Sequence, residues 1–161
     1  MTRLECASVD YECNRRSPKT SGTLRPTRPE SLAAGRYDIG LGDGFALFCK
    51  QVRHVVCVRG VYNAALATGK VDWPRKHEHY DGPLTREALL AALDDKQRQL
   101  LATLETVDIN APIDWDGTPF TFALFTWEFV QHEAIHHGQW SIYASLGGFD
   151  TPLSWRASWG S

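Results

Sequence analysis

The sequence has no long hydrophobic run and almost no net charge, and both absences narrow the class of protein. No window approaches the roughly 20 apolar residues that a membrane-spanning helix needs. With 17 basic and 19 acidic residues and no cluster of Lys or Arg, the chain has no basic stripe to follow a phosphate backbone. We therefore expect no membrane and no nucleic acid among its partners.

Paired cysteines are also missing. The chain has four cysteines, at positions 6, 13, 49 and 57, and no two of them form a CxxC pair. We interpret them as reduced thiols. The first residues carry charges every few positions and lack the apolar segment of a secretory signal, so we expect a cytoplasmic protein.

What the sequence does contain is one domain preceded by a different kind of segment. Residues 1–36 hold three prolines and two glycines among Arg, Ser and Thr, with no period of 3.6 or 2, which predicts an irregular N-terminal segment. Residues 37–161 are long enough to form a single hydrophobic core. We place the folded domain there.

Three helices are expected in this domain. Phe45–Ala67 runs without a breaker up to Thr68-Gly69, although Gly60 weakens it. The second helix follows Thr85 as N-cap, and its apolar stripe consists of Leu89, Leu93, Leu100, Leu101 and Leu104. The third covers 119–146, with Thr118 as cap and Pro119 at its first position, after a loop at 107–119 that has room for a short hairpin.

A fourth helix gives no clear signal. Either a degenerate helix around Glu30–Ala34 completes the bundle, or another subunit does. The two tryptophans after residue 148 are expected to fold back over the helices. The sequence leaves the choice between the two completions open.

Three histidines carry the chemistry. His132 and His136 are four apart and share one helical face, so both imidazoles can bind one ion. His54, in the middle of the first helix among apolar neighbours, is expected to point inward. Three inward histidines would each need a partner, and one shared divalent cation satisfies them together. Glu128 and Gln139 extend the same face as candidates to hold the outer imidazole nitrogens or a bound water.

Four other residues have side chains that can bind metals, but we interpret them in other ways. His137 is rotated by roughly 100° from His136 and is expected on the polar face of the helix. Cys57, one turn after His54, is interpreted mainly as a small buried hydrophobe. His77 and His79 are expected to be solvated in a loop.

The segment from His132 to His136 also matches the H-E-x-x-H pattern of zinc proteases, in which the Glu is the general base. Such enzymes need a third ligand downstream, but position 139 is Gln and no Glu follows Glu133. We keep this class as a minor alternative. It predicts that Glu133 faces the metal, whereas a bundle site predicts that it points away.

The run His132-x-x-x-His136-x-Gly138-Gln139, with the Gly-Gly stop before Pro152, resembles the last helix of the DinB/YfiT-like family. The segment around His54 resembles the earlier helix that supplies the third ligand. His137 stands where that family commonly has Arg, and its long first helix is not visible here. The resemblance implies an all-α up-and-down four-helix bundle, usually a homodimer, with a metal facing a pocket.

The resemblance also implies a function. Its members include enzymes that transfer a low-molecular-weight thiol, such as bacillithiol, mycothiol or glutathione. We therefore expect a transferase that uses a divalent metal ion, zinc or nickel, to deliver such a thiol to a small-molecule electrophile. A metal-dependent hydrolase and a non-catalytic metal-binding stress-response protein remain as alternatives.

Overall fold

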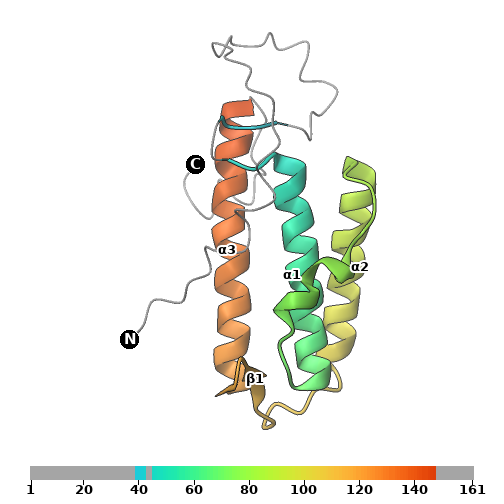
Figure 1. The fold of residues 1–161 in the computed structure, drawn as a ribbon, viewed down its shortest axis with the longest axis vertical. Coiled ribbons are helices and arrows are strands. Elements are labelled where there is room, and N and C mark those ends of the chain that lie inside the picture. Colours follow the sequence, from blue (N-terminus) through green and yellow to red (C-terminus); the bar gives the residue numbers. More distant parts are fainter. Residues whose placement is uncertain (1–38, 43–44, 148–161) are drawn as a thin grey trace.

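The computed structural model describes residues 39–42 and 45–147, and within them the chain is mostly helical. Three α-helices run side by side, with α1 (Phe48–Thr68) between α2 (Arg86–Leu104) and α3 (Phe122–Gly147) (Figure 1). A short 3-10 helix, η3 (Trp73–His79), packs against α1. The hairpin of β1 (Ile113–Trp115) and β2 (Thr118–Phe120) precedes α3. This confirms the expected helical fold.

The number of helices in the complete bundle stays a prediction. The helix expected around residues 30–34 and the two C-terminal tryptophans lie outside the described residues. Among the helices that the structure describes, none is both long and apolar enough to cross a membrane.

Helix α1 matches its predicted span closely. It ends where expected, because Gly69 takes a left-handed conformation with φ of 75° and its N–H donates to the carbonyl of Ala65. Gly60, which weakened the prediction, has a packing role. A Cβ atom there would lie 2.5 Å from Cβ of His79, so the glycine allows η3 to approach α1.

Helix α2 begins as predicted, with Thr85 accepting a hydrogen bond from the N–H of Ala88 at 3.4 Å. The predicted apolar stripe is wrong at its C-terminal end. Leu100 is buried, but Leu101 and Leu104 are 53% and 39% exposed. Since Leu101 is rotated by about 100° from Leu100, the two cannot face α1 together.

The predicted start of the third helix is also wrong. Thr118 and Pro119 belong to β2, where Pro119 pairs with Asp114 in the short hairpin. The Asp116-Gly117 turn has positive φ angles of 51° and 82°, as a two-residue hairpin requires. The cap is Thr121, whose hydroxyl accepts a hydrogen bond from the N–H of Leu124.

The core lies along α1, between α2 and α3. Tyr62 of α1 packs against Phe125 and Phe129 of α3, with ring centroids 5.0 Å apart in both pairs. Its ring centroid also lies 6.4 Å from that of His132. This aromatic packing fixes the part of α3 that carries the histidines against α1.

Candidate metal centre

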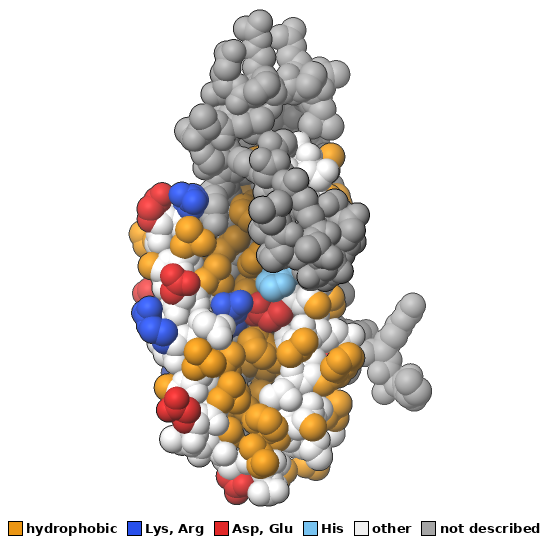
Figure 2. Space-filling view, turned by 180° about the vertical axis from the view of Figure 1, so that it is seen from behind, with side chains coloured by type: hydrophobic (Ala, Val, Ile, Leu, Met, Phe, Trp, Pro, Cys, Tyr) orange, Lys and Arg blue, Asp and Glu red, His pale blue; other side chains and the backbone are white. Residues whose placement is uncertain are grey.

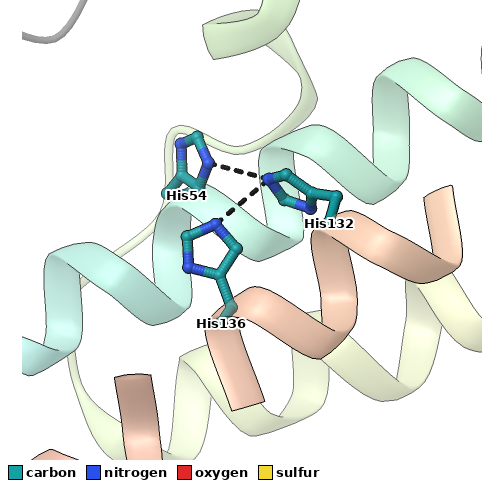
Figure 3. A group of neighbouring side chains, drawn as sticks. All are labelled: His54, His132 and His136. Atoms are coloured by element: carbon teal, nitrogen blue, oxygen red, sulfur yellow. Dashed lines mark hydrogen bonds between the residues drawn. The ribbon is translucent and has the colours of Figure 1, made fainter. Parts of the chain in front are cut away.

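The structure brings the three predicted histidines together at the contact between α1 and α3 (Figure 3). Nε2 of His132 lies 3.1 Å from Nε2 of His54 and 3.1 Å from Nε2 of His136. One ligand nitrogen from each ring falls within 4.8 Å of the others. His54 comes from the middle of α1, and the other two come from adjacent turns of α3. They form a group that could hold a divalent metal ion.

The donor set fits such an ion. Nitrogens bound at 2.0–2.1 Å to a tetrahedral ion are about 3.3 Å apart, which is close to the two observed separations. A single imidazole nitrogen offers either one N–H or one lone pair. Nε2 of His132 therefore cannot form a full hydrogen bond with both neighbouring nitrogens, whereas one cation accepts a lone pair from each ring.

The environment keeps His132 in the neutral form that binds metals. Burial lowers the pKa of His132 to about 4, and the nearby His136 contributes in the same direction. Nδ1 of the same ring is buried and has no hydrogen-bond partner within the described part of the chain. At neutral pH this imidazole is a lone-pair donor that needs no proton removed before it can bind an ion.

The acidic residue beside this group is directed to a different partner. Both carboxylate oxygens of Glu133 accept hydrogen bonds from Arg59, from Nε and Nη2, each at 2.8 Å. The guanidinium also donates to the carbonyl of Leu93 on α2. Figure 2 shows the back of the molecule, where charged side chains and a histidine meet between hydrophobic surfaces. Arg59 was not singled out from the sequence, although a buried carboxylate at position 133 requires a cationic partner.

His137 does not belong to the three-histidine group, as expected from its rotation relative to His136, but its side chain is only partly exposed. Its side chain is 31% exposed, with Nε2 3.8 Å from the Glu133 carboxylate, and its ring lies 5.4 Å from that of Trp140. Burial lowers the pKa of His137. Because Glu133 and His137 are four residues apart on α3, the His137 side chain lies beside the Arg59–Glu133 ion pair.

The two residues expected to support the ligands remain predictions in that role. Glu128 is half-buried, one turn before His132. Oε1 of Gln139 is buried without a hydrogen-bond partner in the described part of the chain. An unsatisfied amide oxygen one turn beyond His136 is available to a bound water or substrate group.

Other candidate groups lie apart from the three nitrogens. Sγ of Cys57 faces the carbonyl oxygen of Tyr80 at 4.0 Å, and burial raises the pKa of this thiol. Neither property favours a thiolate ligand. His77 and His79 lie in η3 and not in a loop as predicted. His77 is exposed as expected, but His79 is half-buried against Gly60, so its predicted solvation is wrong. Gly60 allows this contact, and a glycine inside a predicted helix was the feature of the sequence that could have indicated it.

Together, the fold and the site define a helical protein with a three-histidine group suited to a divalent metal. A scan against protein-family models matches residues 25–140 to the DinB superfamily, and this segment includes all three histidines. The match covers more than two thirds of the chain, which therefore belongs to the DinB superfamily. A search of curated proteins found no match. The domain boundary expected at residue 37 stays a prediction.

Proposed function

We propose that this chain is a metal-dependent transferase in which His54, His132 and His136 hold zinc or nickel and a low-molecular-weight thiol is delivered to a small electrophile. The observation that carries the proposal is the convergence of three Nε2 atoms from two helices. Three protein ligands leave one coordination position for an exchangeable group, which is the arrangement of catalytic rather than structural sites.

Two features of the described residues support an open fourth position. Glu133, the nearest acidic residue in sequence, is held by Arg59 at both oxygens. Cys57 is directed to a backbone carbonyl, and its pKa is raised. The same Arg59 contact weighs against the zinc-protease alternative, since a general base needs a carboxylate free to accept a proton.

When bound, a divalent cation would supply a Lewis acid that lowers the pKa of a thiol or water placed beside it. The chain's own residues supply neutral nitrogen donors and hold them through the α1–α3 packing. In the proposed reaction the thiol gives its proton to solvent, and its sulfur forms a bond to carbon. The leaving group departs with the electron pair of the bond that breaks. A thiol co-substrate stays reduced in the cytoplasm, where we place this reaction.

The test is a conjugation assay with untagged protein loaded with zinc or nickel. Glutathione, bacillithiol and mycothiol are each paired with monochlorobimane, whose fluorescence reports the new sulfur–carbon bond. We expect turnover above the uncatalysed rate with one of these thiols, loss of turnover in His132→Ala, and unchanged turnover in Leu101→Ala, a control on exposed α2 surface.

Two results would contradict the proposal. One is equal conjugation by wild type and His132→Ala. The other is metal-dependent cleavage of an ester in the absence of any thiol, together with no conjugation, which would assign the site to hydrolysis.

A further inference from the structure

A buried lysine, Lys76, lies near the three histidines. It belongs to η3, which packs against α1 and lies across the front of that helix in Figure 1. Lys76 is 8% exposed, and no other lysine or arginine is buried among the residues that the structure describes. Lysine is seldom buried, because its ammonium group loses hydration there. The fold therefore fixes the position of this charge, whereas a surface lysine would turn freely into solvent.

The charge of Lys76 acts on residues of both helices that carry the histidines. Burial and the nearby His136 lower the pKa of His132 to about 4, and Lys76 contributes in the same direction. Burial raises the pKa of the Cys57 thiol, and nearby cations that include Lys76 oppose this rise. Cys57 lies on α1 one turn after His54. Lys76 is thus close to the α1 and α3 segments that form the candidate metal centre.

The same short helix brings an aromatic surface to the histidines. The ring of Trp73, at the start of η3, lies 5.9 Å from that of Tyr62. The Tyr62 ring in turn lies 6.4 Å from that of His132. The close approach of η3 to α1 depends on Gly60, because a Cβ atom there would meet His79 at 2.5 Å. Helix η3 therefore supplies both a cation and an aromatic ring to this region.

The charges around the histidine group are mainly positive. Glu133 is the acidic residue that acts on His132, and both of its carboxylate oxygens face Arg59. Imidazoles bind an ion in their neutral form, so they add no negative charge, and a bound divalent cation would add positive charge. Within the described part of the chain, these surroundings favour a ligand that carries negative charge.

We propose that Lys76 is a specificity-determining residue that binds a carboxylate of a molecule reacting at the three histidines. The inference rests on the proposed function and narrows it to anionic substrates. An ammonium group and a carboxylate form a charge-assisted hydrogen bond, which is stronger in a buried site than in water. The carboxylate belongs either to the thiol or to the electrophile, and two experiments distinguish these sources.

The first experiment measures thiol binding to protein loaded with Co²⁺, whose charge-transfer absorption reports a sulfur ligand. Mercaptoacetate and 3-mercaptopropionate carry a carboxylate, and 2-mercaptoethanol is the neutral probe of similar size. If the thiol supplies the carboxylate, we expect Lys76→Met to weaken binding of an acidic thiol by about tenfold. Binding of 2-mercaptoethanol and the amount of bound metal should not change.

The second experiment measures conjugation of 2-mercaptoethanol by zinc-loaded protein, with iodoacetate or iodoacetamide as the electrophile. If the electrophile supplies the carboxylate, Lys76→Met should raise KM for iodoacetate by about tenfold and leave KM for iodoacetamide unchanged. Lys76→Gln, a second neutral variant, should behave as Lys76→Met does. Lys96→Met is the matched control, because Lys96 lies on α2 and donates to Gln99, and it should behave as wild type does in both experiments.

The outcomes separate this proposal from the proposed function. A Lys76-dependent preference for the acidic probe in either experiment supports the role of Lys76 and identifies the source of the carboxylate. Equal affinities and equal KM values in wild type and both Lys76 variants would overturn the role of Lys76, while thiol binding at the metal would stand. Absence of the sulfur absorption with every thiol would overturn the proposed function and this inference with it.

Discussion

Two polar clusters join the same two helices, and they differ in whether their members satisfy one another. Arg59 and Glu133 form a bidentate ion pair in which every carboxylate oxygen has a donor. The three histidines instead bring nitrogen atoms together that cannot all hydrogen-bond to each other. The ion pair is therefore complete within the chain, whereas the three histidines form a group that could hold a divalent metal ion. Adjacent residues, His132 and Glu133, belong to different clusters because one residue turns a helix by about 100°.

The largest effect should come from breaking the complete cluster. Arg59→Ala leaves the Glu133 carboxylate nearly buried without its partner, and we expect a loss of about 2–4 kcal/mol in the free energy of unfolding. The pair is only 16% and 12% exposed, so solvent screens the remaining charge weakly. Urea denaturation measures this change.

The matched control is Arg98→Ala, since Arg98 pairs with Asp95 at a distance of 3.3 Å with both side chains well exposed. Its loss should stay below about 1 kcal/mol. If Arg59→Ala costs no more than Arg98→Ala, the ion pair does not stabilise the α1–α3 contact.

Acid should weaken the metal-free protein through the histidine cluster. The pKa of His132 is about 4 in the folded chain, against 6.5 when unfolded, so the unfolded state binds more protons between these values. The free energy of unfolding is therefore undiminished by this group above pH 6.5, and it falls by on the order of 2–3 kcal/mol as the pH drops to 4. Burial also lowers the pKa values of His79 and His137, which adds to the same trend.

Urea denaturation of protein freed of metal by a chelator, at several pH values between 4 and 7, measures this dependence. His132→Gln is the comparison. The variant should show a shallower slope. An equal slope in both proteins would mean that His132 is not held neutral by burial.

Replacing Glu133 by Gln tests whether the ion pair and the histidine group act independently. The change removes the charge opposite Arg59, so we expect a loss of about 1–3 kcal/mol in stability. Metal stoichiometry and any thiol-transfer rate should stay within about threefold of wild type, because the carboxylate faces Arg59. Elemental analysis and the conjugation assay check both. Abolished turnover with the metal retained would favour the zinc-protease type of mechanism.

The smallest effect is expected at His137, which borders the ion pair without completing it. Nε2 of His137 is 3.8 Å from the Glu133 carboxylate, beyond a normal hydrogen bond, and burial keeps the imidazole mostly neutral at pH 7. His137→Ala should change the free energy of unfolding by less than about 1 kcal/mol and leave the metal bound. Loss of the metal in this variant would show that the two clusters are coupled.

The same comparison shows how much the sequence could predict. The spacing of His132 and His136 and the apolar surroundings of His54 indicated a shared site, because helical periodicity alone places residues four apart on one face. Helices α1 and α2 were predicted from breakers and from the Thr85 cap for the same local reason. These features depend on residues close together in the chain.

What the sequence could not provide depends on distant contacts. Arg59 and Glu133 are 74 positions apart, and nothing local links them. The start of α3 was misplaced because Thr118-Pro119 has the local pattern of a helix start, yet pairing with β1 makes it a strand. Gly60 looked unfavourable until His79 was found packed against it.

Metal analysis of untagged protein tests the central claim most directly. Wild type, His132→Ala and His137→Ala are purified side by side, dialysed against zinc or nickel, and analysed for bound ion per chain together with X-ray absorption at the metal edge. We predict one ion per chain for wild type and His137→Ala, with imidazole nitrogens at about 2.0–2.1 Å, and almost none for His132→Ala with its helix content unchanged. Stoichiometric metal in His132→Ala, or no metal in any of the three, would contradict the account.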